Sequence, residues 1–145
     1  MTSDADITLD LDQQFCFALY AASRRVVRAY TLVLREFDLT YPQYLVLLVL
    51  WEWHRDRCSQ PTISALGERL ELDSGTLTPL IKRMVGLGLV EKHRQEDDER
   101  QVFITLTRAG INLRRRVCKV PLMMLQHCSL PAPEVVQLRD QLKRL

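Results

Sequence analysis

The sequence predicts a mainly α-helical fold that carries one small β-hairpin. Apolar residues recur at steps of three and four through residues 11–37, the spacing of a long amphipathic helix. Two shorter helical segments, 62–70 and 74–87, are separated by only three residues. Two runs with the alternation and composition of strands, 89–94 and 101–106, follow directly. Two short helices with a hairpin behind them form a winged helix-turn-helix.

The helix after the long N-terminal one is predicted to begin at Thr40. The Thr40 side chain can cap free backbone amides, Gln43 can reach back to residue 40, and Pro42 is tolerated in a first turn. Residues 44–53 are almost wholly apolar and should form a buried helix. Residues 54–61 have the composition of a polar loop.

The second short helix has a polar beginning. Hydroxyl side chains crowd its first turns, and Pro79 fits best if the regular helix begins near Thr76. Gly86 and Gly88 are expected to end it. After the hairpin, Thr107 should cap a helix that contains three consecutive arginines, and residues 134–145 have the pattern of a final amphipathic helix.

Composition limits the function classes. The 145 residues suit a single domain, 47% of them are hydrophobic, and the net charge is +2. No apolar run is long enough to cross a membrane, and the N-terminus lacks the features of a secretory signal, so we expect a cytoplasmic protein. The four cysteines form no Cys-x-x-Cys pair, so we expect reduced thiols and, at most, a regulatory disulfide.

The order of residues from the second short helix to the hairpin predicts binding to double-stranded DNA. A helix N-terminus with free amides and small hydroxyls suits phosphates and base edges, and basic residues one or two turns later can reach the groove. Arginines near the hairpin tip can enter the adjacent minor groove, with Asp98 bracing Arg100. The alternative is that these charges are ordinary solvated surface of a protein-interaction module. The candidate DNA-binding residues are Ser74, Gly75, Thr76, Thr78, Pro79, Lys82, Arg83, Arg94, Asp98 and Arg100.

Several of these segments resemble a known family. The sequence LDSGTLTPLIKRM (72–84), with GLV at 88–90 and DDER at 97–100, is similar to the MarR family of bacterial regulators. LDQQFCFALY (11–20) and LTYPQYLVLLVLWE (39–52) resemble its organic-hydroperoxide-sensing branch, OhrR. The resemblance extends from about residue 11 to residue 121.

The resemblance implies a homodimer with one winged helix in each subunit. The single domain, 1–145, would divide into a helical dimerisation region, 11–53 and 107–145, and a DNA-binding lobe, 54–106. The reduced dimer would repress by binding an inverted-repeat operator and would release it when an organic hydroperoxide oxidises a cysteine. A small thiol would re-reduce the protein, and no cofactor or metal is implied.

Cys16 is the candidate sensor. A thiol reacts with peroxide as its thiolate, and a helix start favours an anion. The resemblance assigns the hydrogen-bond donors of the sulfur to Tyr30 and Tyr41. Because Cys16 and Tyr30 are fourteen residues apart on one predicted helix, about 21 Å along its axis, any contact between them must cross to the partner subunit. Without the flanking motif, Cys16 would be interpreted as a small buried hydrophobic residue.

Oxidation of Cys16 should give a sulfenic acid, which a second thiol converts to a disulfide. In two-cysteine relatives the resolving residue lies in the C-terminal helical region of the partner. Cys128 falls close to that region, and Cys118 is the fallback. Cys58 lies in a loop that is longer than the family pattern, so no role transfers to it.

Three other functions remain open at this stage. A repressor of the same family could respond to a small aromatic ligand bound between the dimer helices and the winged helix. A thiol enzyme could turn over peroxide at Cys16, although no convincing catalytic set is visible and we expect no enzyme. A metal could bind at His54 and Cys58 or at His127 and Cys128, but two ligands do not close a zinc site.

Overall fold

The computed structural model describes residues 9–98 and 100–145. Short 3-10 turns, Leu11–Gln13 and Arg35–Phe37, flank the first helix. The main elements in chain order are α1 (Phe15–Leu34), α2 (Tyr41–Asp56), α3 (Ile63–Leu70), α4 (Ser74–Gly86), β1 (Val90–Arg94), β2 (Val102–Leu106), α5 (Arg108–Val117), α6 (Val120–Gln126) and α7 (Ala132–Leu142). This confirms the predicted mainly helical fold with a hairpin wing behind a helix-turn-helix.

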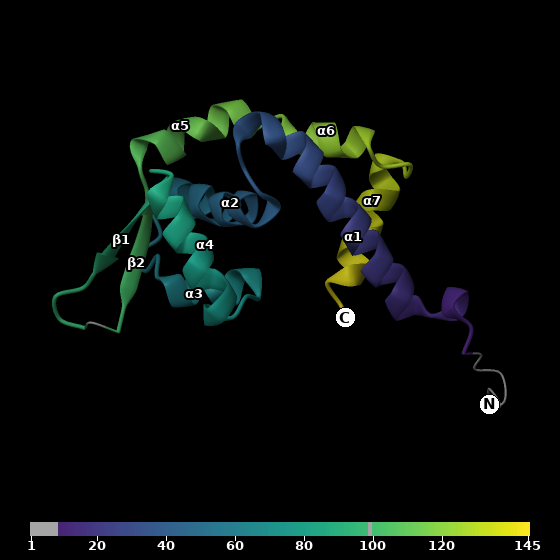
Figure 1. The fold of residues 1–145 in the computed structure, drawn as a ribbon, viewed down its shortest axis with the longest axis horizontal. Helices are drawn as coiled ribbons and strands as arrows, with labels where there is room; N and C mark the ends of the chain where they lie inside the picture. Colours follow the sequence, from purple (N-terminus) through teal and green to yellow (C-terminus); the bar gives the residue numbers. More distant parts are fainter. Residues whose placement is uncertain (1–8, 99) are drawn as a thin grey trace.

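The molecule has two parts, which we call the lobe and the arm. The lobe consists of α2, α3, α4, the hairpin and α5, and the arm consists of α1, α6 and α7. Figure 1 shows the lobe on one side, the arm on the other, and α5 leading from the hairpin toward α6. The division predicted from the sequence, into a DNA-binding region and a dimerisation region, has different boundaries from the lobe and the arm, and it stays a prediction.

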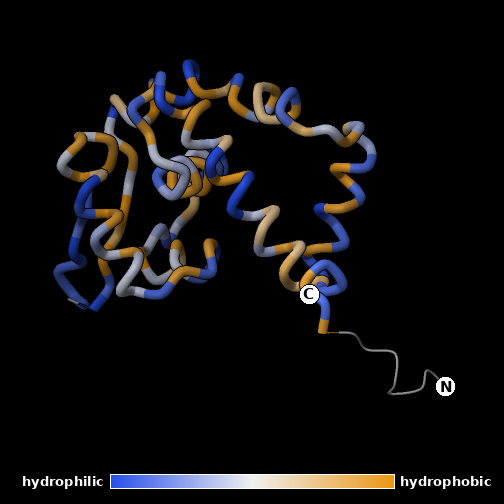
Figure 2. Tube along the Cα trace, turned by 45° about the vertical axis from the view of Figure 1, so that its right-hand side comes forward, coloured by the Kyte–Doolittle hydropathy of each residue, from blue (hydrophilic) through white to orange (hydrophobic). Residues whose placement is uncertain are grey.

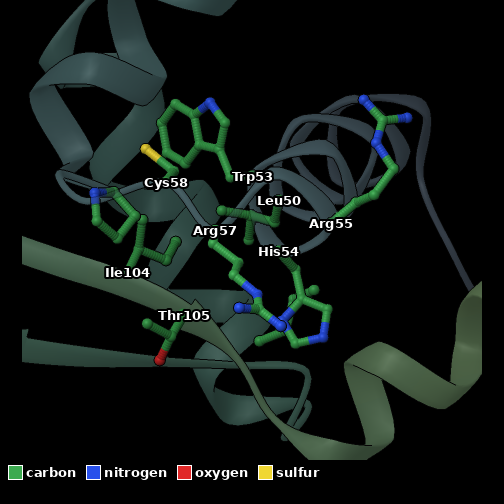
Figure 3. Close-up of a pocket in the computed structure, with 10 residues that line it drawn as sticks. Leu50, Trp53, His54, Arg55, Arg57, Cys58, Ile104 and Thr105 are labelled. Atoms are coloured by element: carbon green, nitrogen blue, oxygen red, sulfur yellow. The ribbon is translucent and has the colours of Figure 1, made fainter.

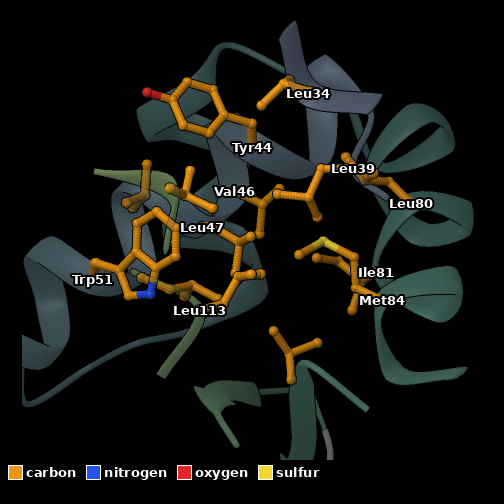
Figure 4. Packing of buried hydrophobic residues seen from close by; sticks show 14 of the residues in the cluster. Leu34, Leu39, Tyr44, Val46, Leu47, Trp51, Leu80, Ile81, Met84 and Leu113 are labelled. Carbon is orange, nitrogen blue, oxygen red and sulfur yellow. The ribbon is translucent and has the colours of Figure 1, made fainter. Parts of the chain in front are cut away.

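Helix α2 provides much of the core of the lobe. Val46 and Leu47 on α2 are fully buried and lie opposite Ile81 and Met84 on α4 (Figure 4). On the other side of α2, the indole N–H of Trp51 donates to the backbone oxygen of Gly110 at 2.9 Å. A Cβ at Gly110 would lie only 2.2 Å from the Leu89 carbonyl oxygen, so α5 can approach this closely only through glycine.

Side-chain caps set the starts of four helices, as the sequence indicates for two of them. The capping box of Thr40 and Gln43 is present at α2, and the Thr107 hydroxyl accepts from Gly110 N–H at α5. At α3 the Thr62 hydroxyl accepts from the Ala65 N–H at 3.1 Å. At α4 the Asp73 carboxylate accepts from Thr76 N–H at 2.7 Å.

Two predicted boundaries were wrong because of local backbone geometry. Helix α2 continues to Asp56 and stops where Arg57 takes the left-handed conformation, φ 53°, so the polar loop is shorter than 54–61. Helix α4 begins at Ser74 rather than near Thr76, because the Asp73 cap starts the helix early. Pro79 therefore lies inside α4, where it has no N–H to donate to the Gly75 carbonyl.

Other differences lie at the two ends of the chain. The predicted helix 11–37 is regular only over α1, with a tighter 3-10 turn at each end. Helix α6 was not predicted from the sequence, and α7 begins two residues before the predicted 134–145 segment and ends at Leu142. The seven residues of α6 make only about two helical turns, which is too short for periodicity to identify a helix.

The hairpin is antiparallel and is attached to the lobe. Val90 pairs with Leu106 at its base and Arg94 with Val102 near its tip. The β2 strand is also joined to the loop before α3, because Ile104 N–H donates to the Pro61 carbonyl at 2.8 Å. The base of the wing is therefore fixed to the end of the α2–α3 loop.

Candidate functional site

Helix α4 has two distinct faces. Leu77, Leu80, Ile81 and Met84 are buried and hold the helix on the core. The opposite face is exposed and carries the candidate DNA-binding residues Ser74, Gly75, Thr76, Thr78, Pro79, Lys82 and Arg83. Within residues 9–98 and 100–145, Lys82 and Arg83 form no ion pair, so both charges are free to meet an external anion.

Asp73 fixes the first turn of this helix. Hydrogen bonds from the Thr76 backbone N–H and side chain, with a smaller one from Gly75, hold the pKa of the Asp73 carboxyl below its ordinary value. The carboxylate is therefore charged at neutral pH and keeps the small residues of the first turn in helical register. Sequence reasoning did not include Asp73, although an Asp before an apolar-periodic segment is a recognisable N-cap signal.

The wing presents Arg94 at the end of β1 and Arg100 in the turn, both exposed. The Asp98 carboxylate accepts a hydrogen bond from the backbone N–H of Arg100 at 3.0 Å. Asp98 therefore shapes the turn backbone, whereas the sequence predicted that it would brace the Arg100 guanidinium. The hairpin tip and the first turn of α4 lie at the same end of the lobe (Figure 1).

A cluster of tyrosines joins α1 to the start of α2. The rings of Tyr30 and Tyr41 stack with centroids 4.3 Å apart, and Tyr44 lies 5.7 Å from Tyr30. Burial, helped by the two neighbouring phenols, raises the pKa of Tyr30 to about 12, and burial also raises the pKa of Tyr41 and of Tyr44. All three hydroxyls are therefore protonated at neutral pH and can donate hydrogen bonds.

The structure thus brings together the two tyrosines that the resemblance singled out. It also adds Tyr44, which sequence reasoning placed only in a buried helix. The signal was available, because Tyr44 follows Tyr41 by one helical turn and the two must share a face.

Cys16 is the second residue of α1 and is exposed. Since α1 is continuous from Phe15 to Leu34, Cys16 and Tyr30 are separated by about 21 Å along its axis, as predicted from the spacing. One subunit therefore does not bring the thiol to its own tyrosines.

The other three cysteines are also free and exposed. Cys128 lies in the connection between α6 and α7, and Cys118 follows α5, where its thiol contacts the Arg115 carbonyl at 3.1 Å. Cys58 belongs to the lobe, at the end of α2. Across residues 9–98 and 100–145 there is no group of three His, Cys, Asp or Glu side chains that could hold a metal, and no helix there is long and apolar enough to span a membrane.

The arm leaves a large apolar surface uncovered. Of the twenty residues of α1 only Val33 and Leu34 are buried, and α7 has no buried residue. Figure 2 shows hydrophobic positions along both segments. The exposed apolar residues of the arm include Phe15, Phe17, Tyr20, Val26, Val27, Leu32, Leu122, Leu125, Val136, Leu138 and Leu142.

Comparison with known proteins places this geometry in a family. A family model described as transcriptional regulator SarA/Rot matches residues 28–117. The organic hydroperoxide resistance transcriptional regulator of Bacillus subtilis is 42% identical over 94% of this chain and 90% of its own length.

Solved structures agree with the sequence comparison. Reduced AbfR bound to DNA superposes with a TM-score of 0.74 at 37% identity, covering 92% of this chain and 90% of that one. A structure of disulfide-formed AbfR has a TM-score of 0.65 at 36% identity over the same shares of the two chains. MarR from E. coli matches with a TM-score of 0.69 at 27% identity over 90% of this chain and 96% of its own. The chain belongs to the MarR family of winged-helix transcriptional regulators, in the branch of the organic hydroperoxide regulators.

Proposed function

We propose that this chain is a redox-sensing repressor whose reduced homodimer binds an inverted-repeat DNA operator and releases it when an organic hydroperoxide oxidises Cys16. The observation that carries the proposal is the position of Cys16. The thiol is exposed at the start of α1, between the exposed side chains of Phe15 and Phe17, which belong to the apolar surface that the arm leaves uncovered. A second subunit packed on the arm would therefore meet the thiol.

The exposed face of α4 is the DNA-reading surface in this proposal. Its first turn offers hydroxyls and backbone amides for phosphates and base edges, and Lys82 and Arg83 supply unpaired charge further along. Arg94 and Arg100 at the wing reach the neighbouring minor groove, with Asp98 holding the turn. The reduced, DNA-bound form of AbfR supports this assignment, since that relative has the same fold.

Dimerisation follows from the arm. Burying an exposed Leu, Val or Phe side chain contributes roughly 1.5–3 kcal/mol, and the arm displays a whole series of them along α1, α6 and α7. A second copy of the chain offers a matching apolar surface. Pairing two arms also places two α4 helices in one molecule, which an inverted repeat requires.

The dimer resolves the separation of Cys16 from its tyrosines. Tyr30 and Tyr41 of the opposite subunit can donate to the sulfur of Cys16, because their phenols are protonated at neutral pH. Hydrogen bonds to the thiolate stabilise the reactive form. The sensor would then lie between subunits, where a change at sulfur alters the distance between the two α4 helices.

The chemical step is two-stage. The Cys16 thiolate attacks the O–O bond of the hydroperoxide, which gives a sulfenic acid and releases an alcohol. The thiol of Cys128 in the other subunit then attacks the Cys16 sulfur, forms a disulfide and releases water. Cys118 is the alternative resolving thiol, and a small thiol reduces the disulfide again. AbfR in a disulfide-formed state supports this pathway.

A DNA-shift assay run beside a non-reducing gel tests the proposal. Cumene hydroperoxide should abolish the shift and produce a covalent dimer in the wild type, and Cys16→Ser should bind DNA with no response. Cys128→Ser should lose the covalent dimer, whereas Cys58→Ser, altered outside the arm, should behave as wild type. Loss of the dimer in Cys118→Ser instead would assign resolution to that residue.

The proposal fails if Cys16→Ser is released by peroxide as readily as the wild type. A repressor that responds to an aromatic ligand through the dimer helices would keep that ligand's effect in Cys16→Ser. A thiol enzyme would show sustained peroxide consumption with a reductant and no affinity for the operator.

A further inference from the structure

Tyr44 differs from the other two members of the tyrosine cluster because it belongs to the core. It is 3% exposed, whereas Tyr30 and Tyr41 are half-buried and pack against the core from outside. The assignment of Tyr30 and Tyr41 as donors to the sulfur of Cys16 leaves Tyr44 without a role. Its ring nevertheless lies beside that of Tyr30, with the ring centroids 5.7 Å apart and the planes tilted by 35°.

The first turn of α2 fixes the backbone of Tyr44. The capping box of Thr40 and Gln43 starts the helix, and the Tyr44 N–H donates to the Thr40 carbonyl at 3.0 Å. The Tyr44 ring lies at the edge of the buried cluster, and its hydroxyl points away from the other labelled side chains (Figure 4). A buried ring on a fixed backbone has few alternative positions, because the surrounding side chains are closely packed.

Packing of the ring holds the Tyr44 side chain, without help from its hydroxyl. Within residues 9–98 and 100–145 the Tyr44 hydroxyl makes no hydrogen bond. In the same part of the chain no buried side-chain nitrogen or oxygen lacks a partner, so the Tyr44 oxygen must reach the surface. The aromatic ring is therefore the part of Tyr44 that can act on its neighbours.

Tyr30 lies where α1 leaves the core. The only buried residues of α1 are Val33 and Leu34, about one turn later, so the helix is anchored near its C-terminal end. The Tyr30 ring contacts two rings of α2. It stacks on Tyr41, which is itself half-buried, at 4.3 Å between centroids, and it meets Tyr44 at a tilt. The contact with Tyr44 therefore links the position of the Tyr30 ring to the core.

We propose that Tyr44 is a positioning residue of the sensor, whose buried ring holds the Tyr30 ring where the Tyr30 hydroxyl can donate to Cys16 of the partner subunit. A hydrogen bond weakens steeply as its angle departs from linearity, so a displaced ring weakens the bond although the donor is still present. The thiolate, which is the reactive form, then loses stabilisation. This inference rests on the proposed function, since it needs Cys16 and Tyr30 to meet between subunits.

The test uses the full chain with Cys58, Cys118 and Cys128 changed to Ser, which leaves Cys16 as its single thiol. The measurement is the rate of Cys16 alkylation by iodoacetamide over a pH series, without DNA, because the midpoint of this profile reports the stability of the thiolate. Tyr44→Leu removes the ring and should move the midpoint upward by about one pH unit. The reaction with cumene hydroperoxide near neutral pH should become up to about tenfold slower. Tyr44→Phe keeps the ring and should leave the midpoint within about 0.3 pH unit.

Matched variants separate positioning from a general loss of stability. Leu66→Ala removes a fully buried side chain from α3 and should leave the midpoint unchanged. Tyr30→Phe removes the donor itself and should shift the midpoint at least as far as Tyr44→Leu does. Tyr44→Met, which replaces the ring with a flexible apolar chain, gives the same test if Tyr44→Leu does not fold. Circular dichroism verifies that each variant is folded, and sedimentation velocity that it is dimeric at the concentration of the assay.

Three results would overturn the proposal. The first is a shift in Tyr30→Phe with none in Tyr44→Leu, which would leave the sensor assignment in place. The second is an equal shift in Tyr44→Phe and Tyr44→Leu, because the hydroxyl and not the ring would then act. The third is a shift of the same size in Leu66→Ala, which would make the effect one of stability alone. An unchanged midpoint in Tyr30→Phe would instead contradict Tyr30 as a donor, and this inference would fail with that part of the proposed function.

Discussion

The lobe and the arm use the same apolar residue types in opposite ways. In the lobe, Leu47 and Leu66 are 0% exposed, whereas in the arm Leu122 is 63% and Leu138 43% exposed. The lobe therefore completes its core within one chain. The arm packs on the core only through its α1 and α6 ends, at Val33, Leu34 and Val120, and leaves most of its other apolar residues exposed, which is the surface that the proposed second subunit would cover. The difference predicts that the two parts respond to mutation through different equilibria, folding for the lobe and association for the arm.

The largest expected effect is on folding of the lobe. Leu66→Ala removes a fully buried side chain from α3 and should lower the free energy of unfolding by about 2–5 kcal/mol. Glu68→Ala, on the exposed side of the same helix, should change it by about 0.5 kcal/mol or less. Urea unfolding followed by circular dichroism measures both. Similar losses in the two variants would show that the lobe lacks the tight core described here.

The next effect is on association of the arm. Leu138→Glu places a charge on the apolar side of α7 and should raise the dissociation constant of the dimer at least about tenfold, equivalent to about 1.4 kcal/mol. The matched control is Gln137→Glu, which adds the same charge at the neighbouring exposed position and should have little effect. Sedimentation velocity over a dilution series gives the constant. An unchanged dimer in Leu138→Glu would remove α7 from the interface.

Sequence reasoning predicted the lobe well because its signals are local. The Thr40 capping box, the turn between α3 and α4, and the alternation of β2 each specify their own structure within a few residues. The exposed face of α4 followed from the same periodicity, since buried residues at steps of three and four leave the opposite side to solvent.

What sequence reasoning missed depends on contacts or on single backbone angles. The end of α2 depends on the left-handed conformation of Arg57, and nothing in a polar sequence identifies which residue adopts it. The predicted role of Asp98 was wrong in detail. Whether its carboxylate accepts from the backbone N–H or from the guanidinium of Arg100 depends on the exact geometry of the turn. The cavity lined by Cys58 and Ile104 (Figure 3) could not be predicted from the sequence, since these two walls are separated by more than forty residues.

The junction between arm and lobe should show an intermediate effect. Thr40 caps α2 and is separated by two residues from the 3-10 turn that ends the α1 region. Thr40→Ala removes one half of the capping box. The expected loss of unfolding free energy is about 1 kcal/mol. Thr40→Ser keeps the hydroxyl and should be nearly neutral. Chemical denaturation of the two variants measures the loss, and an equal loss in both would assign it to the methyl group instead of the cap.

The smallest expected effect concerns a helix cap in the lobe and an ion pair in the arm. The contributions of these two interactions to stability should respond differently to acid and to salt. Asp73 in the lobe and Asp140 in the arm both have a lowered pKa, but the causes differ: the Thr76 backbone N–H for Asp73 and the Arg139 guanidinium for Asp140. A lowered pKa in the folded state means that each carboxylate stabilises the fold above its unfolded pKa, near 3.8. That stability is lost as the pH falls below this value toward the lower folded pKa.

Asp73→Asn keeps a cap that does not titrate. The melting temperature of this variant should therefore fall less than that of the wild type between about pH 5 and pH 3, a range that brackets the unfolded pKa. The difference should persist in about 0.5 M salt, because a hydrogen bond to the backbone is not screened. Asp140→Asn should show a smaller difference, and salt should remove it, because the exposed pair with Arg139 is screened. Salt-sensitive behaviour at Asp73 would mean that the first turn of α4 is held by long-range charge, and the cap would then not be what positions the DNA-facing residues.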